Sequence, residues 1–187
     1  MKGFLFSLGL LLSFAGFSQK LKSFPEFSYT SAEGQTFSNK NLEGKNSIII
    51  LFHLGCPAAM YLLKDLENFN LAKNTDFQYI GILENTNEDI REFNANEKSK
   101  WSDIRTYFNM PPSTIPLLGE CDHENISIRD QGKKKNDVRC RKLAKKLKTK
   151  SSPTLYFVNP EGQITKVKKG YLTPASTEEV RKAYLEF

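Results

Sequence analysis

The sequence predicts an α/β domain with a central, mainly parallel sheet, helices on both faces and an antiparallel hairpin near the C-terminus. Ser47–Phe52 and Phe77–Leu83 are apolar runs without alternation, which is typical of strands buried on both faces. Each run is followed by a segment that reads as a helix, and this order favours strand–helix–strand units. Thr154–Val158 and Gln163–Lys168 flank the turn sequence Asn159-Pro160-Glu161-Gly162, which predicts the hairpin.

The first eighteen residues have the pattern of a secretory signal peptide. Lys2 is followed by GFLFSLGLLLSFAGFS, an apolar run that ends in the small residues Gly16 and Ser18. The run is shorter than the roughly 20 apolar residues that span a membrane. We therefore expect cleavage near Ser18, secretion across the inner membrane into the periplasm, and a mature form without a stable membrane span.

The remaining 169 residues are enough for one domain with a sizeable core. Residues 19–46 are polar and rich in turns, with Glu33-Gly34 and Glu43-Gly44 as turn signals around a short strand or hairpin. We read this segment as an N-terminal extension and residues 47–187 as the domain itself.

Between the strands named above, the pattern predicts further elements in chain order. They are a helix from Pro57 to about Ala72, a helix over Glu88–Phe108, a strand over Ile115–Leu118, a polar loop over Asn125–Asp137, a helix over Val138–Lys148 and a closing helix over Pro174–Phe187.

Positive charge is concentrated in one segment. Arg129–Lys150 holds eleven basic and two acidic side chains, whereas the whole chain has a formal charge of +6. This segment is either a solvated loop and helix face or a docking surface for an acidic partner or membrane surface. Because the chain is expected to be secreted, nucleic acid is not expected as a partner.

Cys56 lies where a reactive thiol is usually placed. It follows a buried strand and precedes a helix, at the sheet edge where parallel α/β proteins gather their chemistry. The positive end of the helix dipole stabilises a thiolate there. Pro57 suits the first helical position, because the N–H that it lacks would have had no partner.

A second feature is the sequence Ser152-Pro153 before the strand Thr154–Val158. A proline that begins a strand cannot donate to the ladder and often marks a special backbone. If the bond before Pro153 is cis, the Ser152 backbone is exposed beside the thiol and can pair with an extended substrate.

The order strand, Cys-Pro, helix and strand, followed by LAKKLKTKSSPTLYFVNPEGQI, resembles the thioredoxin fold. With the additional elements over Glu88–Leu118, the chain is similar to secreted TlpA-like thiol–disulfide oxidoreductases and to AhpC/TSA-like peroxiredoxins. The resemblance covers nearly the whole mature chain. It implies that Cys56 is the nucleophile, that Pro153 is a cis-proline and that the Ser152 backbone contacts substrate.

The catalytic motif departs from that family pattern, because it reads C-P-A-A. Ala59 stands where a dithiol enzyme carries its resolving cysteine, and Ile50 stands where thioredoxin has a buried carboxylate. His53 occupies the place of a peroxiredoxin threonine or serine. It either tunes the thiol or is a packed or partly exposed histidine.

The other two cysteines, Cys121 and Cys140, are expected near the same sheet edge. Strand spacing places Cys121 about 10 Å from the strand before Cys56, whereas a disulfide needs Cα atoms within about 7 Å. A Cys121–Cys140 disulfide is therefore easier to form than a disulfide from either cysteine to Cys56. Both pairings remain open, and so does a form in which neither disulfide is present. Cys121-Asp122-His123 is too local to predict a metal site.

These observations predict a secreted thiol–disulfide oxidoreductase that uses the single nucleophile Cys56 and needs no cofactor or metal. Its partners would be protein thiols and disulfides or a small-molecule thiol. Two alternatives stay open: a one-cysteine peroxidase, and a catalytically silent module that binds an extended partner at the cis-proline edge.

Overall fold

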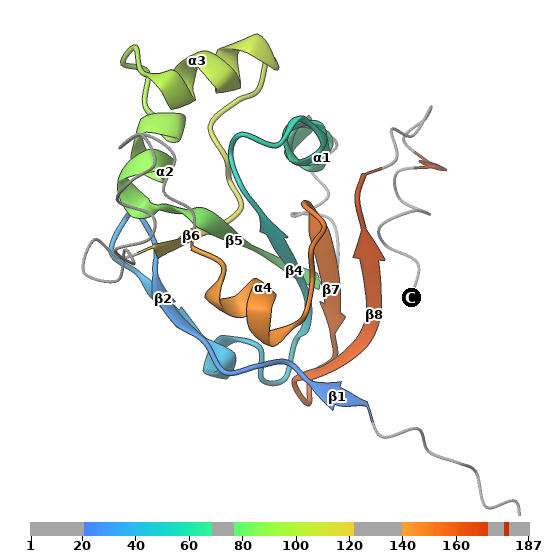
Figure 1. Cartoon of the computed structure of the whole chain (residues 1–187). Coiled ribbons are helices and arrows are strands. Elements are labelled where there is room, and N and C mark those ends of the chain that lie inside the picture. Colours follow the sequence, from blue (N-terminus) through green and yellow to red (C-terminus); the bar gives the residue numbers. More distant parts are fainter. Residues whose placement is uncertain (1–20, 69–76, 122–139, 172–177, 180–187) are drawn as a thin grey trace, which may run out of the picture.

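The computed structural model describes residues 21–68, 77–121, 140–171 and 178–179. In this part of the chain, six strands form one sheet in the order β1-β8-β7-β4-β5-β6, and β2 and β3 form a separate hairpin (Figure 1). The predicted signal peptide, the polar loop 125–137 and nearly all of the predicted C-terminal helix lie outside the described residues.

The strands are β1 (Lys22–Ser23), β2 (Ser28–Thr30), β3 (Thr36–Ser38), β4 (Asn46–Phe52), β5 (Phe77–Thr86), β6 (Leu117–Cys121), β7 (Thr154–Val158) and β8 (Gln163–Lys169). The helices are the 3-10 turn η1 (Asn39–Asn41), α1 (Pro57–Asn68), α2 (Asn87–Asn94), α3 (Lys100–Tyr107) and α4 (Lys142–Lys146). No helix among the described residues is long and apolar enough to cross a membrane.

The predicted α/β class and the C-terminal β7–β8 hairpin are confirmed. The sheet contains both parallel and antiparallel strand pairs. β4 pairs in parallel with β5, and β5 in parallel with β6. On the other side of β4, strands β7, β8 and β1 pair antiparallel. The antiparallel part is larger than a hairpin because the N-terminal segment adds β1 beside β8.

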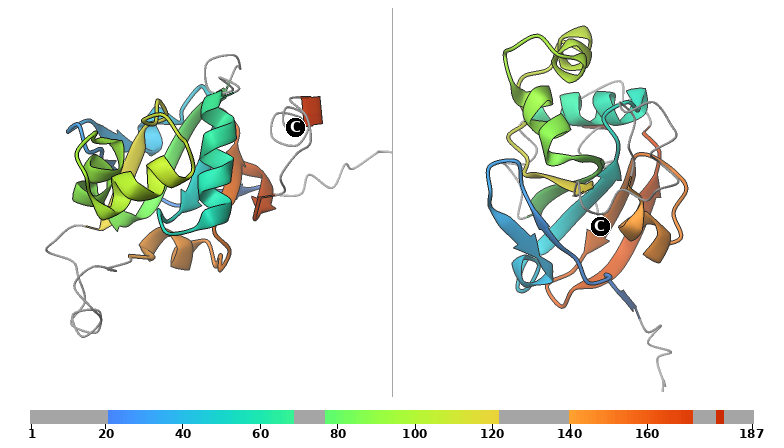
Figure 2. Two further views of the ribbon diagram at one scale, coloured as in Figure 1. Left: turned by 90° about the horizontal axis from the view of Figure 1, so that it is seen from above. Right: turned by 60° about the vertical axis from the view of Figure 1, so that its left-hand side comes forward.

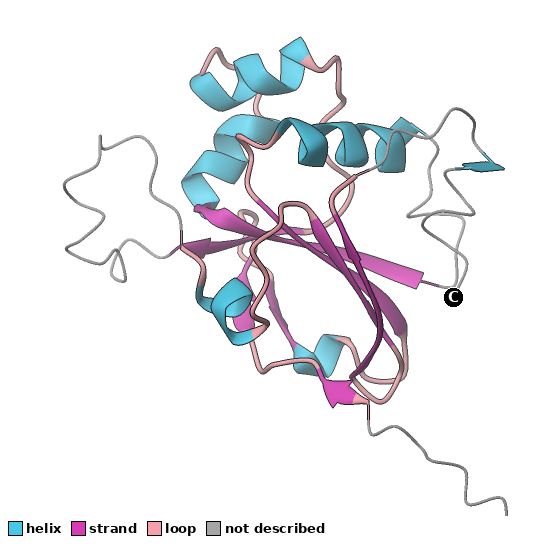
Figure 3. Ribbon diagram, turned by 45° about the vertical axis from the view of Figure 1, so that its right-hand side comes forward, coloured by secondary structure: helices cyan, strands magenta, loops and turns pink. Residues whose placement is uncertain are grey.

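Both faces of the sheet are covered, which explains the unbroken apolar run in β4. Ile48, Ile50 and Phe52 pack with residues of α1, α2 and α3 on one face. Ile49 and Leu51 pack on the other face with α4 and the N-terminal segment. Figure 3 shows α1, α2 and α3 above the sheet and α4 and η1 below it.

The N-terminal segment belongs to the same folded body. Phe24, Phe27, Phe37 and Leu42 are buried in the core on the α4 face. The β2–β3 hairpin lies against β6, where a bridge joins Ser31 to Leu118 (Figure 2).

The predicted helix over Glu88–Phe108 is wrong in one respect, because it is two helices. α2 ends at Asn94, and Ser99 begins α3 by accepting a hydrogen bond from the Ser102 amide at 3.1 Å. The Arg105 guanidinium donates to the Ala95 carbonyl at 2.7 Å and holds the connection between them. The segment between Phe93 and Trp101 has no large apolar side chain, so apolar spacing gave no sign of where one helix ends and the next begins.

Other boundaries also differ from the prediction. β5 runs three residues past Leu83, to Thr86, and β6 begins at Leu117 rather than Ile115. Within the described part of the predicted helix over 138–148, α4 covers only Lys142–Lys146.

Candidate active site

The sheet topology brings four chain segments to one edge. β4, β5 and β6 are parallel, so their C-terminal ends lie together, and β7 begins at the same edge because it is antiparallel to β4. Cys56, the end of β5, Cys121 and the Ser152–Pro153 peptide all belong to this edge. This is the edge at which the sequence predicted the site.

Cys56 is held between a tight turn and the first turn of α1. Its amide donates to the His53 carbonyl at 3.0 Å, which closes the turn after β4. Its carbonyl accepts the Met60 amide at 3.1 Å, the hydrogen bond that opens α1. Cys56 is half-buried, and it is the one free cysteine among the described residues.

The Ser152–Pro153 bond is cis, as the resemblance implies. The Cys56 Sγ donates to the Ser152 carbonyl at 3.3 Å, although the two residues lie 96 positions apart in the chain. Pro153 is buried at the start of β7, and its carbonyl accepts the Gly170 amide at 2.8 Å. The thiol therefore faces the backbone of the cis-proline segment.

Ala59, where the resemblance places the second cysteine of a dithiol enzyme, lies in the first turn of α1. Its side chain is only 1% exposed and packs in the core on the α1 face. The site consequently presents one sulfur to a substrate from this segment of the chain.

Cys121 and Cys140 form a disulfide, with Cα atoms 5.2 Å apart. Cys121 ends β6, two strands from β4, as the topology predicted. The Cys140 amide donates to the Glu84 carbonyl at 3.0 Å, and this hydrogen bond attaches the disulfide to the end of β5. Of the pairings left open by the sequence, this is the one in the structure.

Two buried carboxylates near this disulfide were not predicted. Glu84 at the end of β5 is paired with Arg141, whose Nε lies 2.7 Å from Oε1. Glu120 on β6 is 2% exposed and accepts hydrogen bonds from the Tyr29 hydroxyl and the Leu143 amide. The signal available in the sequence was a glutamate at the end of each of two apolar strands.

Burial raises the pKa of Glu120 from its ordinary value of 4.5, because the low-dielectric surroundings disfavour the carboxylate. The hydrogen bonds from Leu143 and Tyr29 act in the opposite direction, and the charge of Glu84 raises the pKa further. The folded chain therefore holds this proton more tightly than the unfolded chain does. The contribution of Glu120 to stability falls as the pH rises through the unfolded pKa towards the folded pKa.

This sign gives a prediction for Glu120→Gln, which keeps an oxygen acceptor but cannot ionise. We expect its free energy of unfolding at pH 7 to equal or exceed that of the wild type. The advantage should shrink as the pH falls from the folded pKa through 4.5, because the glutamate then becomes neutral in both states. Urea unfolding at pH 4 and pH 7 measures both quantities. An advantage that grew on acidification would contradict the assignment.

His53 is half-buried, and its described contact with the site is through its backbone carbonyl. The chain turns at Leu54 and Gly55, so strand alternation does not relate the side chains of His53 and Cys56. The described residues include no group of three or more histidine, cysteine, aspartate or glutamate side chains that could hold a metal ion.

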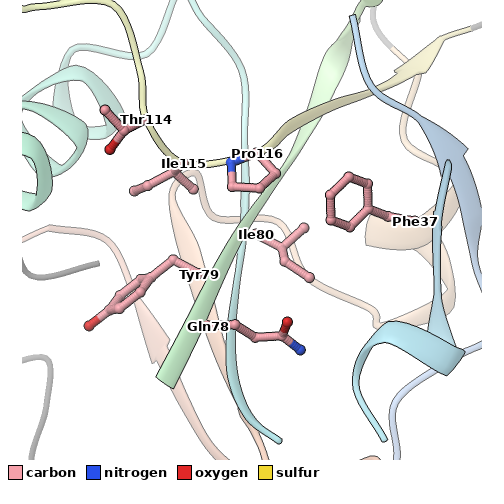
Figure 4. Close-up of a pocket in the computed structure, with 7 residues that line it drawn as sticks. All are labelled: Phe37, Gln78, Tyr79, Ile80, Thr114, Ile115 and Pro116. Carbon is pink, nitrogen blue, oxygen red and sulfur yellow. The ribbon is translucent and has the colours of Figure 1, made fainter. Parts of the chain in front are cut away.

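A cavity of about 240 Å³ lies elsewhere in the fold. It is lined by Phe37, Gln78, Tyr79, Ile80, Thr114, Ile115 and Pro116 (Figure 4). Phe37 lies on β3, and the other six belong to the start of β5 and the segment before β6, at the sheet edge opposite Cys56. The cavity is therefore separate from the candidate active site.

Solved structures share this fold at low sequence identity. The exposed lipoprotein thioredoxin Etrx1 of Streptococcus pneumoniae superposes with a TM-score of 0.54 at 15% identity, covering 85% of this chain and 97% of that one. A secreted disulfide oxidoreductase of Mycobacterium tuberculosis gives 0.51 at 14% identity, with 83% and 92% covered. A thiol:disulfide interchange protein of Chlorobium tepidum gives 0.50 at 19% identity, with 88% and 96% covered.

These similarities establish a thioredoxin-like fold. The search of curated proteins found no match. The family comparison is more specific, because the AhpC/TSA family model matches residues 21–167, most of the chain and the whole of the candidate site. The chain therefore belongs to the AhpC/TSA family.

Proposed function

We propose that this protein is a secreted thiol–disulfide oxidoreductase that works through Cys56 as its single nucleophile. The observation that carries the proposal is the placement of a free, half-buried thiol before α1, 3.3 Å from the Ser152 carbonyl at the cis-proline. Family membership and the thioredoxin-like fold support this reading.

The reaction is thiol–disulfide exchange. The Cys56 thiolate attacks one sulfur of a substrate disulfide, forming a Cys56–substrate bond while the substrate S–S bond breaks. The electron pair leaves on the second substrate sulfur, which takes a proton from solvent. The Ser152 backbone beside Pro153 pairs with the extended substrate segment and aligns its disulfide with Cys56.

Release of the substrate needs a second thiol, and position 59 does not supply one. The substrate's own thiol can attack the mixed disulfide and form a new substrate disulfide, which is isomerisation. Alternatively, a small-molecule thiol attacks and leaves reduced Cys56 together with a substrate mixed disulfide. Both routes suit isomerase or carrier behaviour better than net reduction by two adjacent cysteines.

The periplasm is the proposed location. The signal pattern of residues 1–18 supports it, and one structural neighbour is described as secreted. The Cys121–Cys140 disulfide also suits an oxidising compartment. An acidic partner for the basic segment 129–150 remains a secondary proposal, since residues 129–139 lie outside the described residues.

The test is recovery of active enzyme from scrambled ribonuclease in a glutathione buffer, with non-reducing gels to trap complexes. We expect recovery and a transient complex linked through Cys56. Peroxide-dependent sulfenate at Cys56 without recovery would instead identify a one-cysteine peroxidase. Absence of any Cys56 reaction would identify a silent binding module.

Ala59→Cys should convert the site to a dithiol. A sulfur one helical turn after Cys56 attacks the mixed disulfide within the same molecule, so the lifetime of the trapped complex should fall by about 10- to 100-fold. Ala58→Cys is the matched control, because residues two positions apart do not face each other on a helix. Equal lifetimes for the two variants would contradict the proposed cause of slow release.

A further inference from the structure

In the described part of the chain, the side chain of Asn85 binds the turn that carries Cys56 from outside that turn. The Leu54 amide, inside the His53–Cys56 turn, donates to Asn85 Oδ1 at 2.9 Å. Leu54 is fully buried and Asn85 is 4% exposed. A buried amide needs such a protein acceptor, because leaving it unpaired is unfavourable.

Asn85 reaches this amide from an irregular part of β5. Phe52 and Leu83 form the last regular pair between β4 and β5, and the register of β5 with β6 shifts between Leu83 and Thr86. Such irregularities re-aim side chains at a sheet edge. Beyond the end of β4, the Asn85 side chain takes the place of a neighbouring strand's backbone as the acceptor.

The side-chain amide group of Asn85 is itself oriented by Asp89. Asn85 Nδ2 donates to Asp89 Oδ2 at 3.2 Å, and the Trp101 indole donates to Asp89 Oδ1 at 2.7 Å. The Thr86 amide also donates to Oδ2, at 3.1 Å. Because the Leu54 amide donates and Asp89 Oδ2 accepts, Asn85 turns its oxygen to Leu54 and its nitrogen to Asp89.

We propose that Asn85 is a positioning residue for thiol–disulfide exchange at Cys56, and that Asp89 and Trp101 hold Asn85 in place. This inference rests on the proposed function, because Asn85 is assigned the role of holding Cys56 in the position that thiol–disulfide exchange requires. Two hydrogen bonds fix the turn: Cys56 to His53 within it, and Leu54 to Asn85 across the sheet edge. Together they keep the thiol between the start of α1 and the Ser152 carbonyl.

The test compares Asn85→Ala with Asn39→Ala. Asn39 is the matched control, since its Oδ1 also accepts a backbone amide, that of Phe27 at 2.8 Å, but in the N-terminal segment away from Cys56. Three quantities are measured: the exchange rate of Cys56 with glutathione disulfide, the pH profile of its alkylation by iodoacetamide, and the hydrogen exchange of the Leu54 amide.

For Asn85→Ala we expect Cys56 exchange to slow by about tenfold or more, since small misplacements of reacting groups have effects of this size. Its alkylation profile should move to higher pH, and the Leu54 amide should exchange faster. Asn39→Ala should leave all three at wild-type values. Alkylation does not require a physiological disulfide substrate, so it tests Asn85 even if the proposed function fails.

The proposal would be overturned if Asn85→Ala kept the wild-type exchange rate and alkylation profile of Cys56. It would also be overturned if Asn85→Ala and Asn39→Ala changed these quantities equally. If Asn85→Ala does not fold, Trp101→Phe decides the matter. It keeps an aromatic ring at this buried position, removes the indole donor to Asp89 and leaves a smaller side chain. It should change the same three quantities in the same direction by a smaller amount, and unchanged values would overturn the proposal.

Discussion

Replacing Cys56 by serine should abolish thiol–disulfide exchange, with a loss on the order of 1,000-fold or more relative to the wild type. A serine hydroxyl can still donate to the Ser152 carbonyl, so the fold and the geometry of the turn should persist. A hydroxyl at neutral pH is not a competent nucleophile towards a disulfide. The expected result is a stable protein that neither isomerises scrambled ribonuclease nor forms a complex with it.

The measurement combines ribonuclease recovery with urea unfolding of the same preparation. Unchanged stability with lost recovery assigns the effect to chemistry. Recovery near the wild-type rate in Cys56→Ser would show that another group, such as the Cys121–Cys140 pair, carries the exchange. That outcome would contradict the single-nucleophile mechanism.

Removing the Cys121–Cys140 disulfide should have the opposite pattern of effects. In the double variant Cys121→Ala/Cys140→Ala, we expect the free energy of unfolding to fall by about 3 kcal/mol, the value for a closed loop of some 20 residues. The structure places the two cysteines 19 positions apart and buries both. Alanine is chosen because a serine hydroxyl would be buried there without an assured partner.

The exchange rate of Cys56 in this variant should remain within about twofold of the wild type under conditions where the fold is intact, since sites without shared partners behave independently. Urea unfolding and glutathione disulfide exchange are measured on the same sample. A large loss of turnover with accumulation of the Cys56 mixed disulfide would instead show that Cys121 or Cys140 resolves it. The stability loss alone would not distinguish the two roles.

The elements around Cys56 were predictable because their signals are local. The isoleucine run of β4 and the Cys56-Pro57 pair placed the nucleophile at a strand–helix junction. Pro153 before an apolar strand placed the second half of the site. Because β7 is antiparallel to β4, the start of β7 lies beside the end of β4, and this pairing brings Ser152 to Cys56.

The support of the site was not predictable, because it depends on contacts between distant residues. Glu84 and Asn85 are polar, so the strand prediction stopped at Leu83. They are buried in β5 because Arg141 pairs with Glu84 and the Leu54 amide binds Asn85. The helix break after Asn94 similarly depends on Arg105 reaching back to Ala95. The local signals were Ser99 as a helix cap and a glutamate at the end of an apolar strand, and neither identifies the distant residue that it contacts.

The central claim is that Cys56 works without a partner cysteine from its own chain. Non-reducing peptide mapping of acid-quenched protein taken from the periplasm tests it most directly. The mechanism predicts a Cys121–Cys140 peptide pair, with Cys56 free or linked to a thiol from another molecule. A disulfide between Cys56 and either Cys121 or Cys140 would contradict it and establish a two-cysteine cycle.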